Sequence, residues 1–390
     1  MKYRLNEPTV GTLESNAIDR VIEHTWLGAH GPETREFEKE FAEYHGCKYG
    51  LAVQSGTAAI HTAVWASLYE KRKLQRPVVA CTDYTCSASA AAISMAGDRV
   101  CLVDVEPDTY GMSYEALCLA HAQFEVDAVI LVHVYGIPAR DTMLIKEFCE
   151  DNSIILIEDA CEAHGSDIGG QKIGSLGDIA VFSLRSEKII GVGEGGVVVT
   201  NNEELMKRCI YFANRCKPDD DDWTRKYYTD DIGYNYSLPN VLGAIGLVQL
   251  TRLPSLVKRR RRIAALYRDS MPWLQWQENL PGSSNWLNNA RFPVLSGPGW
   301  TQETDVSIHP LVKAIGNALF AEGVEVRPGF YPMHLQAAFS DAMILETGAM
   351  WESQKIALSS LCLPSHPGLD DDDILDICRL VEQIWNDANS

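Results

Sequence analysis

Residues 128–159 of the 390-residue chain read AVILVHVYGIPARDTMLIKEFCEDNSIILIED, and this stretch decides the predicted fold. It contains two apolar runs, Ala128–His133 and Ile154–Glu158, separated by a segment of helical length, Asp141–Asp151. A continuous apolar run predicts a strand buried on both faces, and two such strands joined by a helix are typical of a parallel sheet. The stretch therefore predicts one strand–helix–strand unit of an α/β domain.

The same alternation extends on both sides of this unit, from about residue 50 to residue 200, and includes a second helical segment at Thr57–Tyr69. Further runs that predict buried strands are Leu51–Gln54, Val78–Cys81, Val100–Val103, Ile179–Leu184 and Gly196–Thr200. Ligands of such sheets usually lie beyond the carboxyl ends of the strands. Because the pattern changes near residue 250, we expect a large α/β domain at residues 1–250 and a smaller C-terminal α+β domain at residues 251–390.

The C-terminal part is dominated by helical patterns. Apolar residues recur at helical spacing from Leu253 to Tyr267, which predicts a long helix with Lys258–Arg262 on its solvent-facing side. The acidic run Asp370–Asp373 precedes another amphipathic pattern and predicts the N-terminus of a last helix. A second acidic run, Asp219–Asp222, opens a polar stretch that predicts an exposed loop.

Composition excludes several classes of protein. The chain has 53 acidic and 34 basic side chains, a formal charge of −19, which argues against a nucleic-acid partner because phosphate neutralisation needs a basic face. No apolar run of about 18 residues or more occurs, so we expect no membrane span, and the start of the chain lacks a signal-peptide pattern. The 11 scattered cysteines, without a CxxC pair or zinc-ligand spacing, predict reduced thiols in a cytoplasmic protein that holds no metal.

Four local patterns at the ends of predicted strands point to one kind of ligand. In the first, Ser55, Gly56 and Thr57 follow a strand and open a helix. Backbone N–H groups and small hydroxyls at such a position suit a phosphate, although the same residues are also an ordinary helix cap. In the second, Asp159 ends a strand, where its carboxylate would lie at the ligand edge of the sheet; capping of the next helix explains it equally well.

The third pattern is Ser183 at the end of a strand, with Lys188 five residues later. A lysine just beyond a strand end in a partly dry cleft can act as an amine nucleophile, whereas most lysines are surface charges. The fourth is a glycine cluster, in which Gly191-x-Gly193-x-x-Gly196 matches the dinucleotide fingerprint. A predicted strand follows it where that motif needs a helix, so we discount a nicotinamide site.

A phosphate cradle, a carboxylate, a hydroxyl and an amine are together the groups that pyridoxal 5′-phosphate (PLP) requires. The amine binds the cofactor covalently, the carboxylate keeps its pyridine nitrogen protonated, and the cradle holds its phosphate. On the residues alone, Lys188 is the candidate amine and Asp159 the candidate carboxylate.

Over nearly its whole length the chain resembles the sugar aminotransferases of the DegT/DnrJ/EryC1/StrS family, which have the aspartate aminotransferase-like fold (PLP fold type I). The segments that carry the resemblance are GPETREFE at 31–38, SGTAAI at 55–60, EDACEAHG at 158–165, FSLxxxK at 182–188, GEGG at 193–196 and GYNY at 233–236. Two more segments, VDVEPDTY at 103–110 and VRPGFYPMHLQ at 326–336, resemble in particular the GDP-perosamine synthases of that family.

The resemblance implies a role for individual residues. Lys188 would be the lysine that carries PLP and Asp159 the partner of its pyridine nitrogen. The other residues that it assigns to the cofactor are Ser55, Gly56, Thr57, Thr85, Cys86, Glu162, Ser183 and Asn235. The last of these would reach the phosphate of a neighbouring subunit, so the resemblance implies a homodimer with shared active sites. Residues expected near the substrate are Glu162, Arg327 and His334.

The reaction implied is transfer of the amino group of L-glutamate to a nucleotide-linked keto sugar, GDP-4-keto-6-deoxymannose, which gives GDP-perosamine. Other acceptors stay open: a dTDP-4-keto-6-deoxyglucose, a 3-keto sugar or a keto-inositol. A regulator that kept the fold and lost turnover is a further alternative, which the intact Lys188, Asp159 and Ser183 disfavour.

Three positions depart from the family's pattern. Cys86 follows Thr85 where an aromatic ring usually stacks on the cofactor, so either Tyr84 takes over this contact or smaller atoms hold the ring. The pair Ser237-Leu238 stands where Arg-Met is usual, and Arg140 lies in a loop that is usually uncharged.

Three tryptophans in loop-like stretches could line a sugar or base site, although we favour packing for them: Trp223, Trp286 and Trp300.

Overall fold

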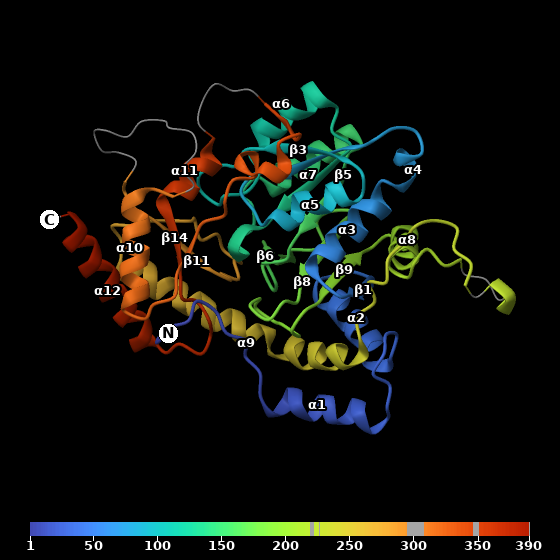
Figure 1. Cartoon of the computed structure of the whole chain (residues 1–390), viewed down its shortest axis with the longest axis horizontal. Helices are drawn as coiled ribbons and strands as arrows, with labels where there is room; N and C mark the ends of the chain where they lie inside the picture. The colour runs from blue at the N-terminus through green and yellow to red at the C-terminus, as the bar shows by residue number, and fades with distance from the viewer. Residues whose placement is uncertain (219–221, 226, 295–307, 346–350, 390) are drawn as a thin grey trace.

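The computed structural model describes residues 1–218, 222–225, 227–294, 308–345 and 351–389. Its main feature is an eight-stranded sheet in the order β1-β9-β8-β5-β4-β2-β3-β13 (Figure 1). The strands are β1 Tyr49–Val53, β2 Val78–Thr82, β3 Arg99–Val103, β4 Ala128–Val132, β5 Ile155–Asp159, β8 Ile179–Ser183, β9 Gly196–Thr200 and β13 Met343–Ile344. All neighbours from β8 to β13 pair in parallel, while β9 is antiparallel to both β8 and β1. The predicted α/β fold with a mostly parallel sheet is confirmed.

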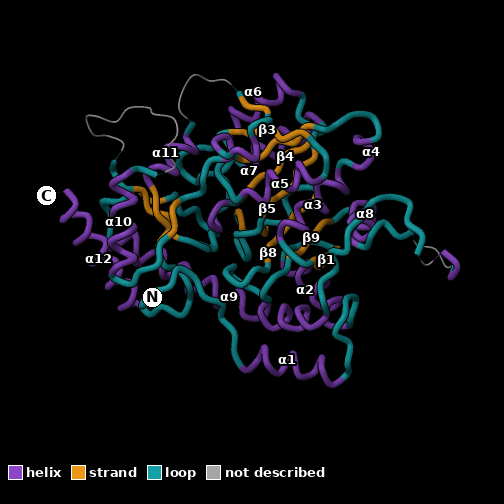
Figure 2. Tube along the Cα trace, viewed as in Figure 1, coloured by secondary structure: helices purple, strands orange, loops and turns teal. Residues whose placement is uncertain are grey.

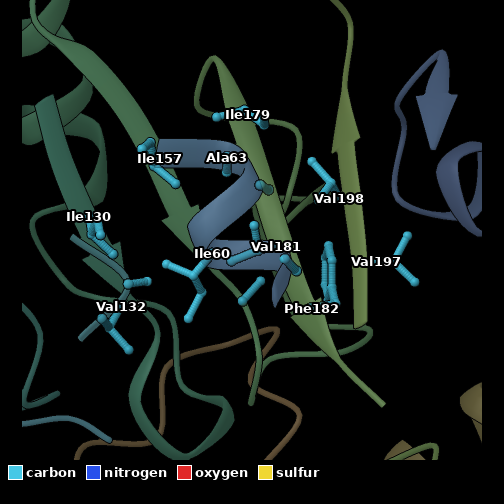
Figure 3. Close-up of a cluster of buried hydrophobic side chains, with 14 of the residues drawn as sticks. Ile60, Ala63, Ile130, Val132, Ile157, Ile179, Val181, Phe182, Val197 and Val198 are labelled. Carbon is cyan, nitrogen blue, oxygen red and sulfur yellow. The ribbon is translucent and has the colours of Figure 1, made fainter. Parts of the chain in front are cut away.

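Helices cover both faces of this sheet. They are α2 Pro32–Tyr44, α3 Gly56–Ser67, α4 Tyr69–Arg72, α5 Ser87–Met95, α6 Tyr114–Phe124, α7 Thr142–Asn152 and α8 Glu203–Ala213. Figure 3 shows Ile60 and Ala63 of α3 beside Ile130, Ile157 and Val181 of three neighbouring strands. The strand residues that point the other way pack against α6 and α7. Because side chains alternate across a strand, burial on both faces explains why these strands are continuously apolar.

The C-terminal half forms a smaller antiparallel sheet in the order β10-β11-β14-β12, with helices beside it (Figure 2). Its elements are β10 Gln275–Trp276, β11 Asn288–Arg291, α10 Pro310–Ala321, β12 Arg327–Pro328, α11 Glu352–Ser359, β14 Ser360–Leu363 and α12 Asp371–Asn389. The remaining elements are helix α1 Thr12–Glu23, the hairpin β6 Asp167–Ile168 and β7 Gln171–Lys172, and short 3₁₀ turns at Val134–Gly136, Trp223–Arg225, Met333–Leu335 and Ala337–Phe339.

Helix α9, Asn240–Ser270, connects the two halves and packs against α1 and α2 at one end and α12 at the other (Figure 1). The boundary expected at residue 250 lies inside this helix. Two other segments also cross between the halves, because Tyr3 belongs to the hydrophobic core of the smaller half and β13 pairs with β3. By length and apolar composition α9 could cross a membrane, but its apolar face is buried in both cores, so it is a core helix.

The acidic run before α12 has the expected capping role. The backbone N–H of Asp370 donates to the Asp373 carboxylate, and the N–H of Asp373 donates to that of Asp370. This reciprocal pair satisfies two backbone donors at the start of the helix. The other run, Asp219–Asp222, lies outside the described residues except for Asp222, which is exposed.

The expectation that Lys258–Arg262 faces solvent is wrong for Arg260, whose exposed fraction is 1%. Its Nη1 donates to the carbonyl oxygens of Trp286, at 2.6 Å, and Ser365, at 3.0 Å, and its Nη2 donates to Oδ1 of Asn6 at 2.9 Å. A guanidinium can be buried when its donors find such acceptors. Three chain segments that are distant in sequence therefore meet at one side chain.

We expect Arg260→Met to lower the free energy of unfolding by about 2–4 kcal/mol, because it leaves two buried carbonyl oxygens without their donor while keeping the side-chain volume. The matched control is Arg262→Met on the same helix, which removes only an exposed ion pair with Asp371 and should cost about 1 kcal/mol or less. Urea unfolding of the two apoproteins measures the difference. Equal losses would contradict a special role for Arg260.

Candidate active site

The candidate site lies at the edge of the large sheet where β5 and β8 end. The two strands pair in parallel, so their last residues, Asp159 and Ser183, lie at the same edge. On the other side of β8 the antiparallel strand β9 begins at Gly196, and α3 begins nearby at Gly56. A cavity of about 410 Å³ opens at this point, a volume in the range of small-molecule sites.

Most of the residues predicted from the sequence line this cavity: Ser55, Gly56, Thr57, Thr85, Cys86, Asp159, Glu162, Ser183, Lys188 and Arg327. They come from five separate segments of the chain, 55–57, 85–86, 159–162, 183–188 and 327. Two predicted residues, Asn235 and His334, do not line it.

One end of the cavity is formed by the N-terminus of α3. Ser55 caps the helix, since its Oγ accepts a hydrogen bond from the N–H of Ala58 at 3.1 Å. A Cβ atom placed on Gly56 would lie 2.8 Å from Cβ of Ser183, and one on Gly196 would overlap the carbonyl oxygen of Ser55. Glycine at both positions therefore lets the helix start, β8 and β9 approach one another closely. Hydroxyls and free N–H groups gathered at a helix N-terminus form an anion site.

Asp159 is held by two hydrogen bonds at the end of β5. Its Oδ2 accepts from Oγ of Ser89 at 2.7 Å, and its Oδ1 accepts from the N–H of Cys161 at 3.1 Å. The side chain is buried but borders the cavity. A carboxylate fixed in this way can accept a further hydrogen bond from a protonated ring nitrogen.

Lys188 lies between a carboxylate and an aromatic ring. Its Nζ is 3.2 Å from Oε1 of Glu162 and 3.6 Å from the ring centroid of Trp286, and its side chain is 10% exposed. The other oxygen of Glu162 accepts from the N–H of Tyr135 at 2.8 Å. Burial raises the pKa of the Glu162 carboxyl, and the charge of Lys188 opposes this rise. The amine is thus confined in a largely dry environment.

Charged side chains gather around Glu187 at the cavity. Nη1 of Arg327 is 2.9 Å from Oε2 of Glu187, and Nη1 of Arg185 is 3.4 Å from its Oε1. Burial alone would raise the pKa of Glu187, but the hydrogen bond from Arg327 and the positive charges around it hold that pKa below its usual value. Glu187 therefore binds both arginines as an anion.

His334 and Asn235 lie elsewhere. Nδ1 of His334 is 2.8 Å from Oδ2 of the buried Asp83, and its ring packs against Trp351. Asn235 is exposed on the segment after α8 and forms a backbone bridge with Asn214. Tyr84 is fully buried and does not line the cavity, whereas Cys86 does line it. This geometry favours small atoms rather than Tyr84 beside a cofactor ring.

Several lining residues were not predicted from the sequence: Ser89, Tyr135, Cys161, Arg185, Glu187 and Phe330. All of them except Tyr135 carried a weak signal, since each lies within four residues of a predicted site residue. Trp286, for which we favour packing from the sequence, lines the cavity beside Lys188. Of the other two tryptophans considered, Trp223 is exposed and Trp300 lies outside the described residues.

The residues present fit PLP. The phosphate would lie at the cradle made by α3 and Ser183, Asp159 would bind the pyridine nitrogen, and Lys188 would provide the amine. Among the described residues no group of three or more His, Cys, Asp or Glu side chains is arranged to hold a metal ion.

Comparisons with known proteins find relatives that match nearly the whole chain. The GDP-perosamine synthase of Vibrio cholerae is 30% identical over 384 residues, which cover 97% of this chain and 98% of that protein. The GDP-perosamine synthase of Caulobacter vibrioides is 31% identical over 384 residues, covering 95% and 96%. Among solved structures, Helicobacter pylori PseC, an aminotransferase involved in the biosynthesis of pseudoaminic acid, superposes with a TM-score of 0.86 at 21% identity, covering 99% of this chain and 100% of that one.

With this fold and these relatives, the chain is a PLP-dependent aminotransferase. The family model of the DegT/DnrJ/EryC1/StrS aminotransferase family matches residues 8–382, and the chain belongs to this family.

We expect Gly56→Ala to weaken PLP binding by about 10-fold, because the new methyl group forces the start of α3 away from Ser183 and weakens hydrogen bonds to a charged phosphate. The control is Gly11→Ala, since a Cβ atom at Gly11 would meet nothing within 4 Å. Titration of the apoproteins with PLP, followed by absorbance, gives both affinities. Unchanged affinity in Gly56→Ala would contradict the assignment of the cradle.

Proposed function

We propose that the protein transfers the amino group of L-glutamate to GDP-4-keto-6-deoxymannose, which gives GDP-perosamine. The single observation that carries the aminotransferase chemistry is the position of Lys188, whose amine borders the same cavity as the Asp159 carboxylate and the N-terminus of α3. The nucleotide and the sugar rest on the names of the relatives that are 30% and 31% identical over nearly the whole chain.

In the proposed reaction the residues of the cavity have distinct tasks. Bound PLP supplies an electron sink for the carbon that loses a proton. Ser183, Thr57 and the N–H groups at the start of α3 hold its phosphate, and Asp159 holds the proton on its ring nitrogen. Lys188 takes a proton from Cα of the amino donor at Nζ, and positioned proton transfer of this kind accelerates a reaction by about 10²- to 10⁴-fold.

Glu162 supports the lysine in this scheme. It is the nearest carboxylate to Nζ, and the N–H of Tyr135 keeps its other oxygen in place. An amine that carries a proton between two carbons is charged for part of the cycle, and a neighbouring carboxylate stabilises that state. Arg327 lines the same cavity and can bind an anionic group of either substrate.

We also propose that the protein works as a homodimer in the cytoplasm, with Asn235 reaching the site of the partner subunit. In support, Asn235 is exposed and lies away from the cavity of its own chain. The segment after α8 extends from the body in Figure 1 and exposes large apolar side chains, of which Trp223 is 83% exposed, Tyr227 87% and Ile232 80%. Apolar residues exposed together are typical of a surface that is covered by a partner.

The proposed reaction is tested with the purified protein, PLP, L-glutamate and a set of keto sugars linked to GDP or dTDP. We expect 2-oxoglutarate and GDP-perosamine, identified by mass and NMR, from the GDP-linked 4-keto sugar. Lys188→Ala should retain PLP without a covalent bond and lose turnover by about 10³-fold or more, because it lacks both the nucleophile and the proton carrier. Full turnover of Lys188→Ala would refute the chemistry, whereas preference for a dTDP-linked sugar would refute only the acceptor.

The shared site is tested by co-expressing Lys188→Ala with Asn235→Ala, at a PLP concentration at which neither variant is active alone. A mixed dimer then contains one site with both changes and one with neither, so random pairing should restore about a quarter of the wild-type activity. The control pair is Lys188→Ala with Asp159→Asn, whose changes fall in the two different sites of a mixed dimer, and it should restore none. No restoration in the first pair, or a monomer in light scattering, would contradict the proposal.

A further inference from the structure

Trp286 contacts the Lys188 region in two ways. The centroid of its ring lies 3.6 Å from Nζ of Lys188. This contact is separate from the one that the same Nζ makes with the Glu162 carboxylate. The edge of the same ring donates from Nε1 to the carbonyl oxygen of Glu187 at 2.6 Å. Since Glu187 directly precedes Lys188, one indole holds both the amine and the peptide group next to it.

Trp286 is itself held firmly. It is 3% exposed, and its carbonyl oxygen accepts from Nη1 of the buried Arg260 at 2.6 Å. A Cβ atom on Gly136 would lie 2.7 Å from the backbone nitrogen of Trp286, so the loop also packs closely against the 3₁₀ turn at Val134–Gly136. The adjacent residue in that turn, Tyr135, donates to Glu162. Trp286 and Glu162, the two residues that contact Nζ, are therefore both held by the 3₁₀ turn at Val134–Gly136.

We propose that Trp286 is the positioning residue for Lys188: its ring face confines the charged amine near Glu162, and its Nε1–H fixes the carbonyl that precedes the lysine. This inference rests on the proposed role of Lys188. A cation over an indole face is attracted by the ring's quadrupole, whose negative side is that face, and the attraction is stronger where water is excluded. The lysine must leave and regain its bond to the cofactor in each cycle, and the indole limits where the free amine can lie.

The first test uses the apoprotein and needs neither substrate. Apoproteins are treated with trinitrobenzenesulfonate, and modification of Lys188 is measured by peptide mass relative to the other lysines. We expect Trp286→Leu to raise the relative rate at Lys188 by about 10-fold, because the amine loses the ring that covers and confines it. Trp286→Phe keeps an aromatic face and should stay within about 3-fold of the wild type.

A matched control separates this effect from a general loss of packing. Trp276 also donates its Nε1–H to a backbone carbonyl, that of Met271 at 3.1 Å, and has the Arg268 guanidinium over its ring, but it does not line the cavity. Trp276→Leu should leave the relative labelling of Lys188 unchanged. Equal labelling in Trp276→Leu and Trp286→Leu, or no change in the latter, would overturn the proposal. A Phe variant that labels like the Leu variant would overturn the role of the ring face, because Phe keeps that face and lacks the Nε1–H.

The second test separates positioning from substrate contact. With PLP bound, Trp286→Leu should lower kcat by about 10-fold, leave KM for L-glutamate within about twofold, and increase the kinetic isotope effect of Cα-deuterated glutamate. A higher KM with unchanged kcat would make Trp286 a substrate contact and would overturn the proposal. If the protein proves not to use glutamate, the labelling experiment still decides whether Trp286 positions Lys188.

Discussion

The parallel pairing of β5 with β8 is the constraint on which the site depends. Because both strands end at the same edge of the sheet, the carboxylate of Asp159 and the hydroxyl of Ser183 reach one cavity. The close approach of Gly56 to Ser183 adds the N-terminus of α3 to that edge. The loop after β8 then turns back along the cavity and carries Lys188 with it. Strand pairing thus brings an anion site, a hydroxyl and an amine together at one edge of the sheet.

The strands of the large sheet could be predicted from the sequence, because burial on both faces leaves a local apolar pattern. Each strand of the large sheet that is buried on both faces has a continuous apolar run, and all seven predicted strands are present within one or two residues. The exception is β13, a two-residue strand at the edge of the sheet that comes from the C-terminal half. A pairing this short and this distant in sequence leaves no periodic pattern.

Some residues of the candidate site could likewise be recognised in the sequence, and others could not. Ser55, Asp159 and Lys188 could be recognised because each stands at a fixed distance from a predicted strand or helix end. Trp286 and Arg260 could not, since their roles come from contacts between segments that are far apart in the sequence. A row of arginines on an amphipathic helix indicates a solvent-facing side, and only the packing of two halves around α9 shows that one of them is buried. The overall charge of −19 does not predict whether the site binds an anion, because surface charges are screened beyond about 8 Å at physiological salt.

The hydrogen bonds of Asn6 connect the beginning of the chain to the loop that carries Lys188. Its Oδ1 accepts from Arg260, and its Nδ2 donates to the carbonyl oxygen of Glu187, the same atom that Trp286 binds. Asn6 precedes residue 8, where the match to the family begins. Part of the support of the loop that carries Lys188 is therefore contributed by a residue outside the span that the family model matches. Removing or remodelling the first few residues would disturb a cavity whose lining lies more than 180 positions away in the sequence.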